Sequence, residues 1–494
     1  MRFASLQLNK QTVLIPEQLS PLQDPLLFHP ISHYKSFPLQ PINKSFKTDL
    51  QLLQVLQGKH LLIDEIPFPL CDIHAHYLNG FIHIEAGLQL KEGNLTCMRC
   101  GSKQAFSHFS CARCGEKDCR YCRNCIVMGK VSSCSPLYSA SVPFQSKQPP
   151  FLLQWKGMLS SGQQEASRAV THAIKKNEEL LVWAVCGSGK TEVLFHGLEE
   201  ALSQNKTICI ATPRTDVVLE LFPRLKKAFP SINLSALYGG SSKDTTQFVI
   251  STTHQLIRYK NFFDVMIIDE VDAFPYNVDS SLQYAVEKSR KKESSLIYLT
   301  ATPSKTMIRN FHPIVRIPAR FHGFPLPIPS LTWVGNWRKE IKKERLPPIL
   351  IKWITQQVGD GKPVLLFLPS ISLIEKVTPL MNKYVQCESV HSEDEDRVNK
   401  VIRFRNNQLP VLLSSTILER GITIPNVSVA VIGAEDDVFT ESALVQIAGR
   451  AGRSKDFPDG SVRFFHYGKT NEMVSAVRLI KGMNREAEER GWLN

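Results

Sequence analysis

The chain has 494 residues, whereas about 150 residues per domain is typical, so several domains are expected. Hydrophobic residues make up 43% and charged residues 21% of the chain, which excludes a largely disordered, collagen-like or coiled-coil protein. The formal net charge of +13 fits a polyanionic partner, either nucleic acid or an anionic membrane face.

Two absences in the sequence bear on where the protein works. No segment reaches the ~18 unbroken apolar residues that a membrane span needs. The first residues, MRFASLQLNKQTVLIPEQ, lack the long apolar centre of a secretory signal. We therefore expect a cytoplasmic protein, with attachment to a membrane protein left open.

The N-terminal region, residues 1–94, is rich in Pro and Leu. Its periodicity is hard to interpret, and we expect a poorly ordered first stretch. Leu and Val at helical spacing predict a helix over 50–61. A cysteine-rich segment follows, and together with a Pro-containing connector at 145–151 it forms a second predicted region over 95–150.

The remainder of the chain alternates between short apolar runs and helical patterns. The runs LLVWAV, TICIAT, QFVIST, DVMIID and SLIYLT predict the strands of one domain, over 151–325. PVLLFLPS, LPVLLSST and VSVAVIGA predict the strands of a second, over 326–494. Between the two sets of strands, the Pro-rich segment RIPARFHGFPLPIPSLTW is expected to be a linker. Such alternation predicts mostly parallel sheets covered by helices, so the fold class is α/β with two domains in tandem.

A phosphate-binding loop is predicted at 184–191, where AVCGSGKT lies between a strand and a helix. It matches G-x-x-x-x-G-K-[ST] with Ala184 in place of the first glycine. Gly187, Ser188 and Gly189 would let backbone N–H groups face phosphate oxygens. Lys190 is expected to bridge the β- and γ-phosphates of ATP, and Thr191 to bind Mg²⁺.

The segment DVMIIDEVDAF supplies the carboxylates that such a site requires. Asp269 and Glu270 end an apolar strand, which would bring them near the ion held by Thr191. Asp269 is the expected Mg²⁺ ligand, through water. Glu270 is expected to position and deprotonate the attacking water.

Further motifs resemble those of superfamily-two helicases and translocases. L-S-x-x-Q at 159–163 resembles the motif that recognises adenine, with Gln163 in that role. DEVD from Asp269, TAT from Thr300, STILERGI from Ser415 and QIAGRAGR from Gln446 follow in the family's order. The resemblance implies two RecA-like domains that bind ATP between them.

An arginine from a second domain can neutralise the charge that develops on the γ-phosphate during phosphoryl transfer. Arg450 and Arg453 of QIAGRAGR are the candidates. Opening and closing of the two domains would then move the protein along a nucleic-acid strand.

Contacts to nucleic acid are less sharply marked. The resemblance implies them for Thr212 and Arg214 in ATPRTD, for Thr253 and Arg258 in STTHQLIRY, and for Thr416. A helix N-cap for Thr212 and a solvated face for Arg258 are the alternatives.

Within superfamily two, the chain resembles the ComFA family of late-competence proteins. WAVCGSGKTE, ATPRTDVVLEL, MIIDEVDAFPY, ESALVQIAGRAGR and YCRNCIVMG carry this resemblance, which spans roughly residues 95–485. It implies an ATP-driven motor on single-stranded DNA that draws transforming DNA through a membrane channel. It also implies late-competence cytosolic proteins and the ComEC channel as partners, a location at the inner face of the membrane, and a possible oligomer.

The cysteine segment predicts zinc, because each C-x-x-C turn supplies two thiolates and a structural site needs four. Three such pairs occur: 97/100, 111/114 and 122/125. The family pattern selects Cys97, Cys100, Cys122 and Cys125, so that replacing Cys111 should leave bound Zn²⁺ unchanged. A compact site from 97/100 with 111/114 is the rival, with Cys119 and Cys134 then joining 122/125. Arg99, Arg113, Arg120 and Arg123 would give this region a basic surface.

Two other functions compete with DNA uptake. The primosomal helicase of replication restart also carries cysteine pairs and Q-x-x-G-R-x-G-R, but its cysteines lie between helicase motifs of the second domain. The other is a zinc-stabilised DNA-binding scaffold with a silent nucleotide site. The intact Lys190, Asp269, Glu270 and Arg453 argue against silence.

Overall fold

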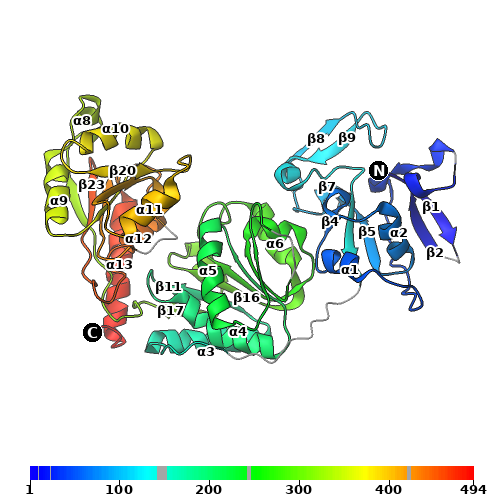
Figure 1. Cartoon of the computed structure of the whole chain (residues 1–494), viewed down its shortest axis with the longest axis horizontal. Coiled ribbons are helices and arrows are strands. Elements are labelled where there is room, and N and C mark those ends of the chain that lie inside the picture. The colour runs from blue at the N-terminus through cyan, green and yellow to red at the C-terminus, as the bar shows by residue number, and fades with distance from the viewer. Residues whose placement is uncertain (9–10, 23, 142–152, 242–245, 420–423) are drawn as a thin grey trace. The chain divides into compact units, whose positions relative to one another are not determined.

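The structure is a computed structural model, and it describes residues 1–494 except 9–10, 23, 142–152, 242–245 and 420–423 (Figure 1). The predicted connector at 145–151 lies outside the described residues. Two compact units are present. Unit 1 comprises Met1–Trp155, His172–Glu179 and Leu198–Ile297, and unit 2 comprises Lys156–Thr171, Leu180–Gly197 and Tyr298–Asn494.

The prediction of a poorly ordered N-terminal stretch is wrong. Strand β1 (Arg2–Leu8) pairs antiparallel with β2 (Gln11–Pro16) and β3 (His29–Pro30). These strands bury Phe3 and Val13 in one cluster with residues of α1 and α2. The order comes from this packing against residues about 40 to 70 positions further on, which local periodicity does not reveal.

The predicted helix over 50–61 is confirmed for its first part, as α1 (Leu50–Leu56). It begins after Asp49, whose side chain accepts hydrogen bonds from the N–H groups of Gln51 and Leu52. It ends early because Gly58 has a positive φ of 65°. The chain then continues into β4 (Leu61–Leu62) and α2 (Leu70–Leu78).

The cysteine segment is inserted into a small antiparallel sheet of order β4-β10-β5, in which β5 (Ile82–Ala86) precedes the cysteines and β10 (Pro136–Ala140) follows them. Two hairpins form the insertion, β6 (Leu88–Lys91) with β7 (Asn94–Cys97), and β8 (Phe106–Phe109) with β9 (Cys119–Cys122). The 3₁₀ helix η5 (Arg123–Met128) follows. The predicted boundary between 94 and 95 falls inside β7, and all the predicted domain boundaries stay predictions.

The first predicted α/β domain contains a seven-stranded sheet of order β13-β14-β12-β15-β16-β11-β17. Its strands are β11 (Glu179–Ala184), β12 (Ile208–Thr212), β13 (Leu234–Leu237), β14 (Phe248–Thr252), β15 (Phe263–Asp269), β16 (Arg290–Thr300) and β17 (Ile314–Ile317). The pairs β12–β14, β12–β15, β13–β14 and β11–β17 are parallel. The helices are α3 (Ser161–Lys176), α4 (Lys190–Ser203), α5 (Thr215–Ala228), α6 (Ser280–Ser289) and α7 (Lys305–Asn310), with the 3₁₀ helix η6 (Thr253–Arg258).

The second α/β domain has a six-stranded parallel sheet of order β18-β23-β22-β19-β21-β20. Its strands are β18 (Ser330–Trp333), β19 (Val364–Phe367), β20 (Cys387–Val390), β21 (Val411–Ser414), β22 (Ser428–Ile432) and β23 (Val462–His466). Its helices are α8 (Trp337–Lys342), α9 (Pro348–Gly359), α10 (Ile371–Met381), α11 (Arg397–Arg405), α12 (Glu441–Ala448) and α13 (Asn471–Glu489), with the 3₁₀ helix η7 (Thr416–Leu418).

The strands of this second sheet are apolar on both faces. In β19, Leu365 and Phe367 join one buried cluster, and Val364 and Leu366 join the other. Continuous apolar runs of this kind are what a parallel sheet covered on both sides requires. The predicted fold class, two tandem RecA-like parallel-sheet domains preceded by a small cysteine-rich region, is confirmed. Across the described residues, no helix is both long and apolar enough to cross a membrane.

Candidate nucleotide site and cysteine region

The predicted phosphate-binding loop lies between β11 and α4. Gly187 and Gly189 have positive φ values of 81° and 74°, a conformation that side chains disfavour and glycine tolerates. Ser188 is buried, and Lys190 and Thr191 are the first two residues of α4. The loop therefore presents backbone N–H groups at a helix N-terminus, the arrangement that binds phosphate oxygens.

Gln163, predicted to recognise adenine, packs directly on this loop. Its Nε2 donates to the carbonyl oxygen of Ser188 at 2.8 Å, and its Oε1 accepts from the N–H of Ser160 at 2.8 Å. A Cβ added at Gly189 would lie 2.3 Å from Gln163 Nε2, so a larger residue at this position would displace the Gln163 side chain. In this structure Gln163 braces the loop.

The predicted carboxylates end β15 as expected. Asp269 is its last residue, and Asp269 Oδ1 accepts a hydrogen bond from the N–H of Glu270 at 2.9 Å. Glu270 has a φ of 55°, a left-handed conformation that costs energy for a residue with a side chain. Both side chains are half-buried. These residues belong to unit 1 and the phosphate-binding loop to unit 2, so their mutual geometry stays a prediction.

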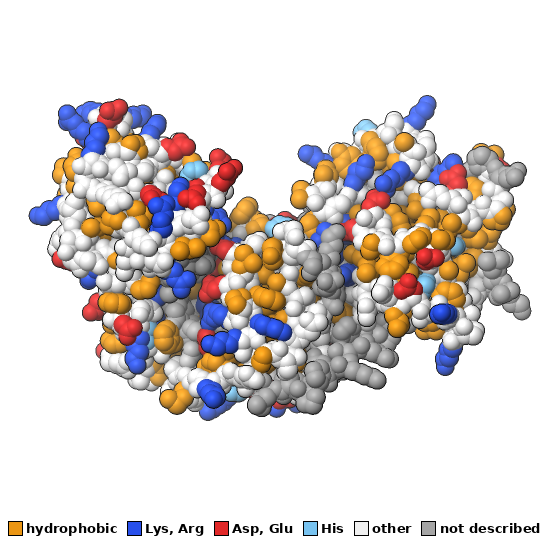
Figure 2. Space-filling view, viewed as in Figure 1, with side chains coloured by type: hydrophobic (Ala, Val, Ile, Leu, Met, Phe, Trp, Pro, Cys, Tyr) orange, Lys and Arg blue, Asp and Glu red, His pale blue; other side chains and the backbone are white. Residues whose placement is uncertain are grey.

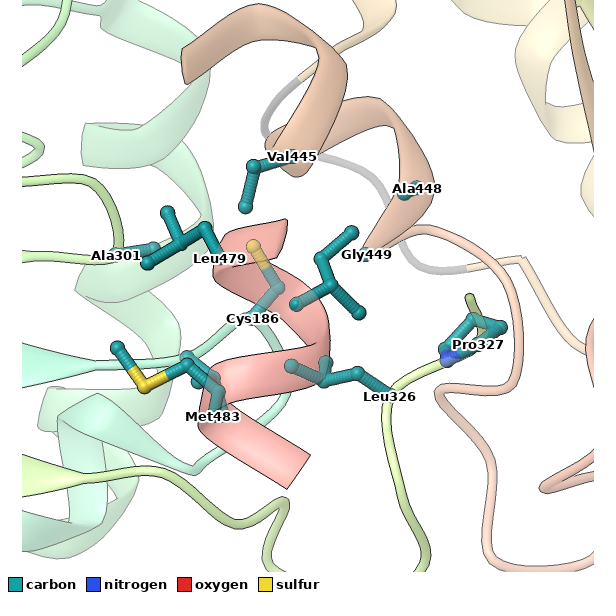
Figure 3. A pocket seen from close by; sticks show the side chains of 11 residues that line it. Cys186, Ala301, Leu326, Pro327, Val445, Ala448, Gly449, Leu479 and Met483 are labelled. Carbon is teal, nitrogen blue, oxygen red and sulfur yellow. The ribbon is translucent and has the colours of Figure 1, made fainter. Parts of the chain in front are cut away.

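The segment QIAGRAGR packs against the phosphate-binding loop within unit 2. Cys186 Sγ donates to Gln446 Oε1 at 2.9 Å, and a Cβ added at Gly449 would lie 2.5 Å from that of Cys186. Figure 3 shows Cys186 pointing toward Val445 and Gly449 in an apolar pocket. Thr302 of TAT also reaches α12, with its Oγ1 2.7 Å from Ser442 Oγ. The helicase motifs of the two domains thus touch one another.

The two candidate arginines end this segment. Arg450 is buried, and its Nε donates to the carbonyl oxygen of Glu419 at 2.9 Å. Arg453 is half-buried, and its Nε donates to the carbonyl oxygen of Gly449 at 3.2 Å. Arg453 therefore lies four residues beyond Gly449, the residue that packs against Cys186, just after the turn that follows α12.

Arg320 is a residue of this site that the sequence did not single out. It lies in the Pro-rich linker, is fully buried, and donates to the carbonyl oxygens of Ala451 at 2.7 Å and of Gly452. The next N–H, that of Phe321, donates to the carbonyl oxygen of Gly187 at 3.1 Å. Burial, with Arg453 nearby, lowers the pKa of Arg320 to about 10, so it stays charged at neutral pH. Nothing in the composition of the linker distinguishes this arginine from its neighbours.

Most residues predicted to contact nucleic acid have side chains that are buried or paired. Thr212 and Thr253 are fully buried, and the N-cap of α5 is Arg214, so the alternative role of Thr212 as a helix cap is wrong. Arg214 forms an ion pair with Asp216 at 2.8 Å. Thr416 is half-buried at the start of η7, and residues 420–423 after it lie outside the described part of the chain.

Arg258 is occupied by a carboxylate of the N-terminal region. Its Nε lies 2.8 Å from Glu65 Oε1, and the fully buried Arg99 contacts Glu65 Oε2 at 2.7 Å. Burial alone would raise the pKa of Glu65, but Arg99 and Arg258 hold it below its ordinary value. The suggestion that Arg258 lies on a solvated face, and that Arg99 is part of a basic surface, is therefore wrong.

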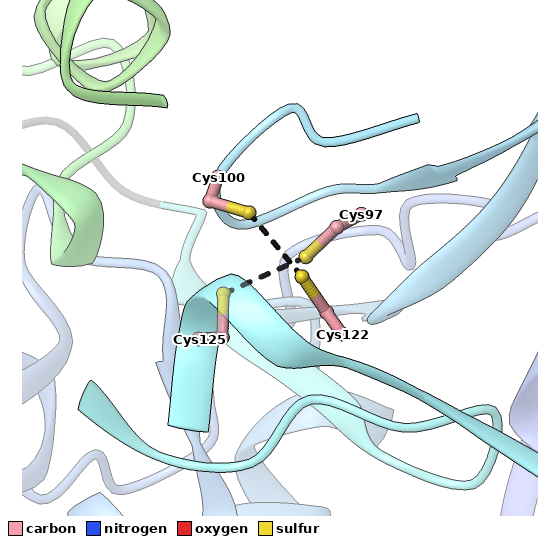
Figure 4. A group of neighbouring side chains, drawn as sticks. All are labelled: Cys97, Cys100, Cys122 and Cys125. Carbon is pink, nitrogen blue, oxygen red and sulfur yellow. Dashed lines mark hydrogen bonds between the residues drawn. The ribbon is translucent and has the colours of Figure 1, made fainter. Parts of the chain in front are cut away.

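The four cysteines selected as zinc ligands come together. Cys97, Cys100, Cys122 and Cys125 are buried, with Sγ–Sγ separations of 3.7 Å for 97/125 and 3.5 Å for 100/122 (Figure 4). A tetrahedron of thiolates about 2.3 Å from Zn²⁺ has edges of about 3.8 Å. The residues present therefore fit the ion. The rival grouping of 97/100 with 111/114 is not the one that the structure forms.

This cysteine group also packs on the first RecA-like domain. A Cβ at Gly101, which has a φ of 74°, would lie 2.5 Å from the ring of Tyr284 in α6. Asn124 Nδ2 donates to Ser281 Oγ at 3.1 Å. The half-buried Lys288 of α6 donates to the carbonyl oxygen of Arg99 at 2.7 Å. Within unit 1, the cysteine region is thus fixed to the helicase fold.

Comparison with known families first defines the class. Residues 156–305 match the family model "Type III restriction enzyme, res subunit", and residues 342–455 match "Helicase conserved C-terminal domain". The structure is similar to the Mycobacterium smegmatis helicase Lhr bound to single-stranded DNA and AMP-PNP, with a TM-score of 0.50 and 18% identity. That alignment covers 67% of this chain and 50% of Lhr, and it shows the fold alone. The chain is a helicase-like, DNA-dependent ATPase.

The N-terminal region then defines the family. Residues 43–139 match the "Competence protein ComFA N-terminal domain". The chain is 50% identical to the competence protein ComFA of Bacillus subtilis, covering 90% of this chain and 98% of that one. It is 36% identical to ComFA of Streptococcus pneumoniae, over 81% of this chain and 93% of that one. The chain belongs to the ComFA family of competence proteins, and the resemblance seen in the sequence is confirmed. It begins by residue 43, earlier than the expected start near residue 95.

Proposed function

We propose that this protein uses ATP hydrolysis to move single-stranded DNA into the cytoplasm during the uptake of transforming DNA. The observation that carries the proposal is the contact between the phosphate-binding loop and QIAGRAGR. Cys186 and Gln446, from motifs 260 positions apart, meet at 2.9 Å. When residues of both domains contact the γ-phosphate of bound ATP, hydrolysis can be coupled to the relative movement of the two domains.

The residues of the site divide the chemistry among them. Lys190 would bind the β- and γ-phosphates, and Thr191 with Asp269 would hold Mg²⁺, which neutralises charge on the phosphates. Glu270 would orient the attacking water and accept its proton. Arg453, and Arg450 behind it, would stabilise the charge that develops on the transferred phosphoryl group.

We propose fewer side-chain contacts to nucleic acid than the motifs alone suggested. Of the five candidate side chains, Thr212 and Thr253 are buried and Arg258 is paired with Glu65. We therefore assign the strand contact to the backbone of the segments 212–216 and 252–254, to Thr416, and to Arg214, which would exchange its ion pair with Asp216 for a phosphate. Figure 2 shows Lys and Arg side chains spread over the visible surface of both units, in keeping with the net charge of +13.

Zinc and protein partners complete the proposal. The first cysteine group would bind one Zn²⁺ and hold the N-terminal region on α6. Family membership supports other late-competence cytosolic proteins and the ComEC channel as partners, and a place in the cytoplasm beside the inner face of the membrane. A role in replication restart is the alternative, and it is less favoured because the cysteines here precede the phosphate-binding loop.

The test compares ATP turnover with single-stranded DNA, duplex DNA, a forked duplex and RNA, each at low and moderate salt. Single-stranded DNA should raise the turnover rate most, and the stimulation should weaken as salt rises, because phosphate contacts release counterions. Equal turnover with and without every nucleic acid would refute the motor. Stimulation by forked duplex alone would favour the restart helicase.

A second test separates DNA uptake from DNA binding. In a naturally transformable host that lacks its own relative of this protein, the wild-type chain should restore transformation and Lys190→Ala should not. Restoration by Lys190→Ala would show that ATP hydrolysis is dispensable for uptake. The exposed Lys305, in α7, supplies the control Lys305→Ala, which should restore transformation fully.

A further inference from the structure

A second group of four sulfur atoms lies in the cysteine region, apart from the first. Cys111, Cys114, Cys119 and Cys134 are all buried, and their Sγ atoms lie within 4.8 Å of one another. The separations are 3.7 Å for 111/134 and 4.0 Å for 119/134. These values bracket the edge of about 3.8 Å expected for four thiolates on one Zn²⁺.

The backbone around the inner pair repeats that of the first group. In Cys97–Gly101 and Cys111–Gly115 alike, the glycine N–H donates to the carbonyl oxygen of the first cysteine at 2.8 Å. Gly101 and Gly115 have nearly equal positive φ values, 74° and 73°. This tight turn aims both thiols of a C-x-x-C-G sequence at one point, which is the local geometry of a zinc knuckle.

Packing alone does not account for the second group. Its buried cluster contains only the four cysteines, with Phe109 packed against it. Around it, Ala112, Arg113 and the residues 115–118 are exposed. A loop of this kind has too small an apolar core to hold four side chains together, and small loop-rich regions need a disulfide or a metal instead. None of these four cysteines forms a disulfide, so binding to a metal ion is the remaining way to hold the four side chains together.

We propose that Cys111, Cys114, Cys119 and Cys134 bind a second zinc ion. Four thiolates without oxygen or nitrogen ligands close a tetrahedral site and leave no position for substrate, so this ion is structural. The two sites interleave along the chain: 97 and 100 belong to the first, 111, 114 and 119 to the second, 122 and 125 to the first, and 134 to the second. Each ion therefore closes a loop that contains ligands of the other.

The second ion would also hold the segments around Ser32 and Asp64, in the N-terminal region, to the cysteine region. The neighbour of Cys134, Ser133, accepts a hydrogen bond from Ser32 N–H through its carbonyl oxygen at 3.0 Å. On the other side of the group, Arg113 contacts Asp64 at 3.1 Å. Fixing Cys134 and the 111/114 turn thus fixes both contacts. Under this proposal, replacing Cys111 lowers the amount of bound zinc, the opposite of the expectation drawn from the family pattern.

Metal content of the purified full-length chain tests the proposal. Wild-type protein should carry about two Zn²⁺ per chain by elemental analysis, and Cys111→Ser about one. Cys97→Ser should also carry about one, and the double variant almost none. Cys71→Ser is the matched control, since Cys71 is exposed and outside both groups, and it should keep both ions.

A titration of the metal-free wild-type chain with Co²⁺ keeps the test independent of whether a variant folds. Thiolate-to-cobalt absorption should rise until about two equivalents are bound. Saturation at one equivalent, with zinc content near one in the wild type and unchanged in Cys111→Ser, would overturn the proposal. Neither measurement depends on ATP turnover, so its failure leaves the proposed motor untouched.

Discussion

The phosphate-binding region and the cysteine region are built by different means. β11 and its neighbours are apolar runs in a large parallel sheet, so burial of hydrophobic area holds the phosphate-binding loop in place. The cysteine region has a buried cluster of only a few residues, and it adds sulfur groups and a buried ion pair. The comparison teaches that the catalytic loop rests on packing, whereas the cysteine region rests on a small number of polar and sulfur contacts.

The largest expected effect concerns ATP turnover at the phosphate-binding loop. Lys190→Ala should lower ATP turnover by at least about 100-fold, because it removes a charge that stabilises the transferred phosphoryl group. The circular dichroism spectrum should not change, since Lys190 is half-buried and outside the apolar clusters. Turnover assays with Lys305→Ala as control measure this. Retained turnover would show that the loop is misassigned.

The second effect belongs to the N-terminal region. Glu65→Gln removes the carboxylate that faces two arginines, one of them fully buried, and should cost about 3 kcal/mol of stability in unit 1. Hydrogen exchange should then speed up together in α1, α2 and η6. Glu116→Gln, at an exposed carboxylate of the cysteine region, is the control. Equal rates of hydrogen exchange in both variants would mean that the ion pair contributes nothing to stability.

A smaller effect concerns the contact between the helicase motifs. Gly449→Ala places a Cβ 2.5 Å from that of Cys186 and should cost about 2 kcal/mol through overpacking. Because it pushes α12 away from the phosphate-binding loop, turnover should fall while nucleotide binding persists. Gly482→Ala in α13 is the matched control, since its new Cβ meets nothing within 4 Å. Thermal unfolding and ATP turnover are measured for both variants. Equal unfolding temperatures and equal turnover in the two variants would contradict this prediction.

The smallest effect is a dependence on pH. The pKa of Glu65 lies below its ordinary value of 4.5, because Arg99 and Arg258 outweigh the opposing effect of burial. Its contribution is therefore full above pH 4.5 and lost as the pH falls through the lower pKa of the folded state. The stability difference between wild type and Glu65→Gln should shrink on acidification. A difference that stayed constant to low pH would contradict this assignment.

The sequence predicted the helicase fold because its signals are local. Apolar runs such as DVMIID form strands. Glycines such as Gly187 and Gly189, placed between a strand and a helix, indicate a phosphate-binding loop. The order of the N-terminal strands escaped prediction, since Phe3 and Val13 are buried by residues of α1 and α2. Packing between distant segments has no signature in a short window.

Of the candidate site, the residue types were predictable and several of their contacts were not. The pairing of Arg258 with Glu65 joins residues 193 positions apart. The segment STTHQLIRY alone therefore could not show that Arg258 is paired and not exposed to solvent. The role of Arg320 depends on carbonyl groups at the end of α12, which no sequence pattern displays. The grouping of eight cysteines into two sites likewise requires the hairpins that interleave them.

The central claim is that Arg453 of the second domain acts on the same nucleotide as Lys190 of the first. The direct measurement is ATP turnover with single-stranded DNA, together with nucleotide affinity, in Arg453→Ala. The control is Arg485→Ala, whose side chain is 80% exposed. The account predicts that Arg453→Ala binds nucleotide and turns it over at least about 100-fold more slowly, while Arg485→Ala matches the wild type. Full turnover in Arg453→Ala would contradict it.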